Sequence, residues 1–104
     1  MANLYSPIIE RLVKSSDVVI TDSEEYTTNG ESIVITKKPT KIILDNTKQN
    51  HIVIKSLTDT KIVPKEGLID EEYNELNIGK GACVEFFFGF TNWYILSSDG
   101  VKLD

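Results

Sequence analysis

The order of hydrophobic and polar residues predicts short β-strands along most of the chain. Short apolar runs alternate with polar turns that contain glycine, proline, asparagine or aspartate. Runs spaced by roughly 8–12 residues are typical of β-sandwiches, barrels and prisms. We expect strands at 18–21, 32–36, 41–44, 51–55, 61–64, 73–78, 82–88 and 92–96.

Turn residues indicate how these strands connect. Asn29-Gly30 lies between two apolar runs, and both residues of an Asn-Gly pair tolerate the positive φ that a tight hairpin requires. Gly89-Phe90-Thr91 separates the last two runs and predicts a second hairpin. No exact internal repeat is visible. The pattern therefore predicts an all-β fold: a single small antiparallel β-sandwich or β-prism-like domain of about eight short strands.

The first 16 residues follow a different pattern. Pro7 suits the first turn of a short helix with Ser6 as its N-cap. One face of that helix carries four apolar residues, Ile8, Ile9, Leu12 and Val13. We expect residues 1–16 to form a helix or arm, and residues 17–104 to form the β domain. The arm either covers one end of the sheet or docks on another protein.

Charge and composition exclude several classes of protein. The net charge is −5, with 16 acidic and 11 basic residues, which disfavours nucleic-acid binding. No apolar run approaches the roughly 18 residues of a membrane span, and the N-terminus does not read as a signal peptide. One cysteine allows no intrachain disulfide, and one cysteine with one distant histidine makes no metal site. We expect no cofactor and synthesis in a reducing cytoplasm.

Candidate catalytic residues are few. His51 begins a strand without a partner motif, and Cys83 lies in an apolar strand that favours an inert thiol. The acidic cluster Asp70-Glu71-Glu72 with Glu75 lacks the ligand order of a calcium loop, so we expect it to face solvent. A small hydrolase using Asp70, Glu72 or Glu75 stays as an alternative. The basic residues Lys37, Lys38 and Lys41 have no interleaved aromatic side chains, so they argue weakly for nucleic acid.

Aromatic residues are densest near the C-terminal end of the pattern. Phe86 and Phe88 share one strand face and Phe87 takes the other, because side chains alternate across a strand. A lone small sheet would leave one of these faces in water, so we expect Phe86, Phe87, Phe88 and Trp93 to fill the core or a subunit interface. A carbohydrate-binding sandwich that stacks sugars on Trp93 and Tyr94 is the alternative.

Segments between residues 41 and 96 carry a family resemblance. They are Ile52-Val53-Ile54-Lys55, Lys61-Ile62-Val63-Pro64, Gly67-Leu68-Ile69-Asp70, Leu76-Asn77-Ile78, Gly81-Ala82-Cys83-Val84-Glu85-Phe86 and Trp93-Tyr94-Ile95-Leu96. Together they resemble tailed-phage virion proteins: tail-fibre and tail-spike segments, head fibres and capsid-decoration modules. The chain departs from that pattern at Asp45, where proline is usual, and at Glu71, where glycine is usual.

The resemblance implies a trimeric β module without catalytic residues. We therefore expect a non-enzymatic structural protein of a phage virion that decorates the capsid or forms part of the neck, tail or fibre. Its expected partners are two further copies of itself and other virion proteins (capsid, portal or tail), with Ile8, Ile9, Leu12 and Val13 as attachment residues. Nucleic acid and membranes are not expected partners, and a surface glycan is a further partner to test.

Overall fold

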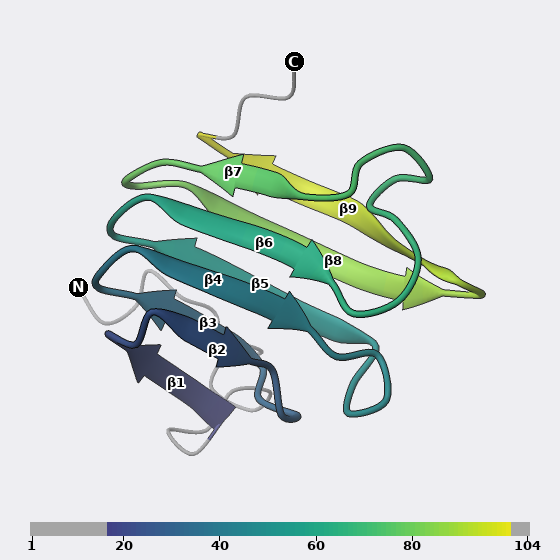
Figure 1. Ribbon diagram of the computed structural model, residues 1–104, viewed down its shortest axis with the longest axis horizontal. Helices are drawn as coiled ribbons and strands as arrows, with labels where there is room; N and C mark the ends of the chain where they lie inside the picture. Colours follow the sequence, from purple (N-terminus) through teal and green to yellow (C-terminus); the bar gives the residue numbers. More distant parts are fainter. Residues whose placement is uncertain (1–16, 101–104) are drawn as a thin grey trace, which may run out of the picture.

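Nine strands form two stacked sheets in the computed structural model, which describes residues 17–100 (Figure 1). Sheet A has five strands in the order β1-β3-β5-β8-β9, and sheet B has four in the order β2-β4-β6-β7. The strands are β1 (Val18–Thr21), β2 (Glu25–Thr27), β3 (Ile33–Thr36), β4 (Thr40–Leu44), β5 (His51–Ser56), β6 (Thr60–Pro64), β7 (Leu76–Ile78), β8 (Cys83–Gly89) and β9 (Asn92–Asp99). The predicted all-β sandwich is confirmed. The predicted arm at 1–16 lies outside the described residues.

The first six strands coil between the two sheets. Each strand from β1 to β6 lies in the sheet opposite to the preceding strand, so that β1, β3 and β5 become parallel neighbours, as do β2, β4 and β6. A parallel pair needs a crossover connection, and here the strand in the other sheet supplies it. The result is a short coil of stacked turns.

The antiparallel prediction is wrong for this coiled part. Asn29-Gly30 does not close a hairpin, because β2 and β3 belong to different sheets. Gly30 nevertheless has the positive φ of 98° that its turn requires. A 20-residue repeat is also present: Thr40-Lys41-Ile42 and Thr60-Lys61-Ile62 are register partners in β4 and β6. Outside this triplet the repeat preserves only residue character, so it is not visible as identity.

The last three strands reverse direction and close the molecule. β7 pairs antiparallel with β6, β8 with β5, and β9 with β8. The hairpin at Gly89-Phe90-Thr91 is confirmed. Beside it, the segment Leu68–Asp70 binds the outer edge of β9: the amide of Trp93 donates to the carbonyl of Leu68 at 2.9 Å, and the amide of Asp70 donates to the carbonyl of Trp93 at 2.8 Å. This segment therefore covers the part of the β9 edge next to the hairpin, whereas Leu96–Asp99 is exposed.

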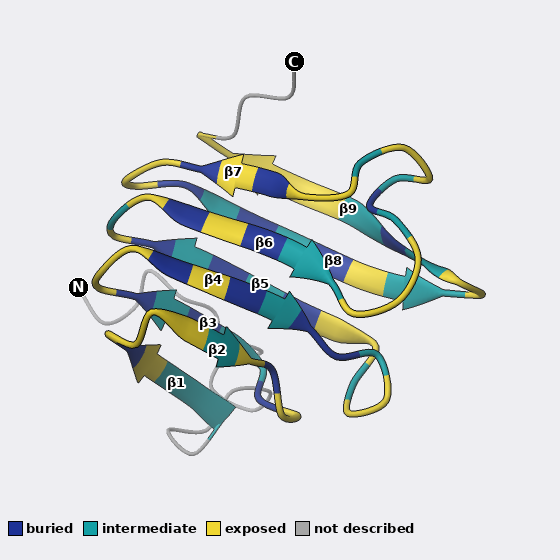
Figure 2. Cartoon of the chain, viewed as in Figure 1, coloured by how far each residue is buried: buried dark blue, intermediate teal, exposed yellow. Residues whose placement is uncertain are grey.

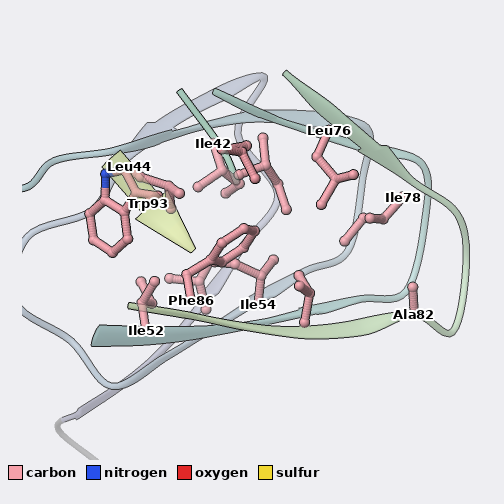
Figure 3. Close-up of a cluster of buried hydrophobic side chains, with 13 residues drawn as sticks. Ile42, Leu44, Ile52, Ile54, Leu76, Ile78, Ala82, Phe86 and Trp93 are labelled. Atoms are coloured by element: carbon pink, nitrogen blue, oxygen red, sulfur yellow. The ribbon is translucent and has the colours of Figure 1, made fainter. Parts of the chain in front are cut away.

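The core lies between the sheets. Figure 3 shows Ile52, Ile54 and Phe86 of sheet A pointing toward Ile42 and Leu76 of sheet B. All five side chains are buried. Along β4 and β7, buried positions alternate with more exposed ones, as expected for strands with one face toward the core (Figure 2). Burial of this apolar surface is the main stabilising contribution to the fold.

Hydroxyl groups line the buried turns at one end of the core. Thr36, Ser56 and Thr60 are buried, and the Oγ1 atoms of Thr36 and Thr60 lie 2.7 Å apart. Ser56 Oγ donates to the carbonyl of Gly79 at 2.5 Å. These bonds satisfy polar groups that would otherwise be costly to bury.

Candidate assembly surface

The outer face of sheet A carries apolar side chains near its β1 edge. Along the register, Val18, Ile33 and Val53 form one row, and Ile20 and Ile35 form the next. We call these five residues the outer-face patch. Strands β1 and β3 have apolar residues on their inner faces as well, at Val19 and Val34.

Apolar residues at successive outward positions, as in the outer-face patch, are unusual on a sheet face that contacts water. Ile20 is 62% exposed, and the other four residues are half-buried. A solvated sheet face normally alternates apolar with polar residues, whereas strands covered on both faces are apolar throughout. The outer face of sheet B is mixed, since Glu25, Lys41 and Lys61 form a charged row there and Thr27, Ile43 and Val63 form the next row. The outer-face patch differs in having two adjacent rows without a charged residue on β1 and β3. The patch therefore has the composition of a covered surface.

Sequence reasoning missed the outer-face patch, although the signal is present. Asp17-Val-Val-Ile-Thr21 and Ser32-Ile-Val-Ile-Thr36 contain three consecutive β-branched apolar residues each, with no polar residue between them. Such a run predicts a strand covered on both faces.

Polar residues border the patch on β5, β8 and β9. His51 Nε2 lies 2.5 Å from Glu85 Oε2, and Ser97 Oγ donates to Glu85 Oε1 at 2.9 Å. Lys55 Nζ donates to the carbonyl of Gly81 at 3.0 Å. A hollow of about 230 Å³ beside these groups is lined by Val53, Cys83, Glu85, Ser97, Ser98 and Asp99.

The geometry of this polar cluster does not favour nucleophilic catalysis. The serine hydroxyl donates to the carboxylate, and the carboxylate, not the imidazole, occupies the centre of the chain of hydrogen bonds. A nucleophile must instead donate to its base. The cluster therefore fixes side chains at the border of the patch.

The pKa of the Glu85 carboxyl shows whether the hydrogen bonds of this cluster form in solution. The hydrogen bond from His51, followed by that from Ser97, holds the pKa of the Glu85 carboxyl below its ordinary value. A lowered pKa in the folded state means that the stabilisation is complete above the ordinary glutamate pKa and is lost as pH falls through the lowered one. We expect His51→Ala to raise the Glu85 pKa more than Ser97→Ala does. Carboxyl titration by NMR measures both, and an unchanged pKa in His51→Ala would show that the pair does not form in solution.

The aromatic residues fall on the two faces of sheet A. Phe86 and Trp93 are fully buried, with ring centroids 6.5 Å apart at 88°, and Phe88 packs against Trp93 at 5.3 Å. Phe87 points outward and is 39% exposed. Tyr94, its register partner, donates to Glu71 at 2.7 Å. A sugar stacks on an exposed ring, so the buried Trp93 does not support the carbohydrate-binding hypothesis.

The predicted attachment residues Ile8, Ile9, Leu12 and Val13 lie outside the described residues.

Three members of the acidic cluster have partners, and one of them is Glu71, which accepts the hydrogen bond from Tyr94. Asp70 Oδ1 accepts from the amide of Ile95 at 2.9 Å, and Glu75 lies 3.7 Å from Lys61 Nζ. Asp70 and Glu71 both have positive φ, because they form the tight turn that lies beside β9. The expectation that the whole cluster simply faces solvent is therefore wrong for Asp70. Within residues 17–100 no group of three histidine, cysteine or acidic residues could hold a metal ion.

A wider hollow lies on sheet B. It measures about 590 Å³ and is lined by Pro39, Thr40, Lys41, Asp59, Thr60, Lys61, Asn77, Ile78 and Gly79. Of the three basic residues Lys37, Lys38 and Lys41, only Lys41 lines this hollow.

In the described part of the chain, no helix is long and apolar enough to cross a membrane.

Comparison with known proteins leaves the outer-face patch as the main guide to function. No protein-family model, no curated protein and no solved structure matches this chain.

Proposed function

We propose that this chain is a non-enzymatic structural protein whose β-sandwich packs against further copies of itself through the outer-face patch. The observation that carries the proposal is the pair of apolar rows on the outer face of sheet A, with Ile20 62% exposed. An apolar cluster of this kind on a small domain marks an interaction surface.

A second copy suits this surface better than a partner of one charge sign. The border of the patch carries both signs, with Lys55 on β5, Glu85 on β8 and Asp99 on β9. Around a threefold axis, the same face of each copy can therefore place opposite charges side by side at the border of an apolar centre. An apolar centre with a polar rim is the usual anatomy of a protein interface.

The wider setting that we propose is a phage particle. The resemblance of residues 41–96 to tailed-phage virion modules supports a homotrimer that decorates a capsid or forms part of a neck, tail or fibre. In that setting Ile8, Ile9, Leu12 and Val13 would attach the trimer to a capsid, portal or tail protein. The symmetric arrangement would bury the same patch on every copy.

Replacing Ile20 by lysine tests the patch directly. We expect Ile20→Lys to raise the dissociation constant of the oligomer at least about tenfold, because a charge would have to be buried among apolar side chains. Leu57→Lys is the matched control, since Leu57 is an apolar residue, 44% exposed, in the turn between β5 and β6. Sedimentation velocity over a dilution series measures both variants.

A second substitution shows whether weaker association comes from the patch or from a local disturbance of the edge strand β1. Ile35→Lys places the charge one strand further in, on the same row as Ile20. We expect the same weakening as for Ile20→Lys. Equal dissociation constants for wild type, both patch variants and Leu57→Lys would rule out the outer-face patch as the contact surface.

A further inference from the structure

Within residues 17–100, sheet A has an open stretch at each of its two outer edges. At one end, no strand of this range pairs with the outer edge of β1, Val18–Thr21. At the other end, Leu68–Asp70 binds β9 beside Trp93, and no strand of the described chain pairs with the outer edge of Leu96–Asp99. Open edges recruit other strands, because their amides and carbonyls have no partner in the sheet.

The edge of β1 lacks the residues that usually prevent strand addition. Its sequence, Val-Val-Ile-Thr, contains neither a charged residue nor a proline. The carbonyl of Thr21 accepts from the amide of Lys37 at 2.9 Å, so the backbone groups of Thr21 point toward β3. Backbone groups alternate in direction along a strand. The amide and carbonyl of Ile20 therefore point to the outer edge, where a further strand would bind them.

The strands at the two edges run in the same direction (Figure 1). β1, β3 and β5 are parallel, β8 is antiparallel to β5, and β9 is antiparallel to β8. A rotation about an axis that follows the strands preserves their direction. β9 of one copy can therefore lie beside β1 of the next copy as a parallel strand, so that sheet A continues from one chain into the other.

The side chains of the two edges match when Thr21 lies opposite Ser98. Ser98 is the register partner of the buried Val84, so it lies on the face of sheet A that is directed toward the core. Thr21 is buried and lies on that same face. Two positions earlier, Leu96, which is 57% exposed, would lie beside Val19. This register pairs hydroxyl with hydroxyl and apolar with apolar side chains.

The charges at the two edges are also complementary. A hollow of about 300 Å³ at the end of β1 is lined by Ile20, Thr21, Asp22, Lys37 and Lys38. Two lysines and one aspartate give this hollow a net positive charge, which favours an anionic partner. In the parallel arrangement Asp99 of the second copy, the residue after Ser98, would lie at this end of β1.

We propose that β1 of one copy pairs, as a parallel strand, with Leu96–Asp99 of β9 in the next copy. The inference rests on the proposed self-association and names the strands that form the contact. Two different edges meet, so the contact is head-to-tail and closes into a ring when the rotation between copies is threefold. Ile20 belongs to this edge and to the outer-face patch, so the two contact surfaces are continuous.

Disulfide cross-linking of the full-length chain tests the pairing. Thr21→Cys and Ser98→Cys are each made together with Cys83→Ser, because Cys83 is the single cysteine. Both changes replace a hydroxyl residue by one of similar size. Opposite residues of neighbouring strands lie about 5 Å apart, a spacing that a disulfide can span. After mild oxidation we expect a covalent dimer from a mixture of the two variants, and a covalent trimer when one chain carries both changes.

Leu57→Cys, also with Cys83→Ser, takes the place of Ser98→Cys in the control mixture. Leu57 is exposed, but it lies in the turn between β5 and β6 and not on an edge of sheet A. We expect no covalent dimer of the two variants in this mixture. Equal cross-linking in the control and test mixtures would mean that the dimers arise from random collision, and would overturn the inference.

Two further results would contradict the edge contact. A covalent dimer from Thr21→Cys alone would mean that β1 pairs with β1 of another copy. Absence of any cross-link would exclude the pairing of β1 with β9. If light scattering then gives the mass of an oligomer, only the edge contact fails and association through the outer-face patch stands. If it gives the mass of one chain, self-association fails as well.

Discussion

Gly67→Ala is expected to destabilise the fold by about 4 kcal/mol, the combined effect of φ strain and overpacking. Gly67 has a φ of +77°, and a Cβ atom added there would lie 1.8 Å from the carbonyl oxygen of Thr91. The nearest atoms belong to the backbone of Thr91 and not to a flexible side chain, so the backbone segments at Gly67 and Thr91 would have to move apart. Separation would pull Leu68 away from Asn92, whose Oδ1 accepts the Leu68 amide at 2.9 Å.

Chemical denaturation followed by fluorescence measures this effect, because Trp93 is the single tryptophan and is fully buried. Gly81→Ala is the control. Gly81 also has a positive φ, of +91°, but an added Cβ atom would meet nothing within 4 Å. We expect it to cost about 1 kcal/mol, from strain alone. Similar values for the two variants would contradict the close approach of Gly67 to Thr91.

Phe86→Ala is expected to cost about 4 kcal/mol, as is usual when a buried phenylalanine is truncated and a cavity remains. Its ring is fully buried and packs edge-on against Trp93. Phe87→Ala makes the same chemical change one position along the strand, on the outer face. We expect it to cost less than about 1 kcal/mol in the monomer, because that side chain is 39% exposed.

The comparison must be made at a concentration where the chain is monomeric, so that interface effects at Phe87 do not enter. Urea denaturation with free energies of unfolding extrapolated to water provides the two values. Equal losses for Phe86→Ala and Phe87→Ala would mean that both faces of β8 are packed within one chain.

Local pattern was sufficient to find the strands and their faces. The expected strands at 51–55 and 73–78 are present as β5 and β7, and their alternate residues Ile52, Ile54, Leu76 and Ile78 are buried. Strand pairing was not accessible in the same way, because a parallel neighbour is chosen by residues 15 to 20 positions away. The Asn29-Gly30 signal reports a turn, and the turn is present. It does not report which sheet the chain enters afterwards.

The strands that carry outward-facing apolar side chains were not identified from the sequence. An excess of apolar bulk over what one sheet can hide led us to expect an assembly, and we assigned that excess to the aromatic hairpin. Phe86 and Trp93 were expected in the core or in a subunit interface, and both are buried in the core. Apolar side chains that face outward lie on β1, β3 and β5, because consecutive β-branched residues in β1 and β3 place apolar side chains on both faces of the sheet. The partners of Asp70 come from β9 and could not be anticipated from spacing.

The most direct test of self-association is the mass of the wild-type chain in solution. Light scattering coupled to size-exclusion chromatography, at micromolar concentration, should give about 35 kDa, three times the 11.7 kDa of one chain. The mass should fall toward that of one chain in Ile20→Lys and remain unchanged in Leu57→Lys. A wild-type mass of 11.7 kDa across the concentration range would contradict the account.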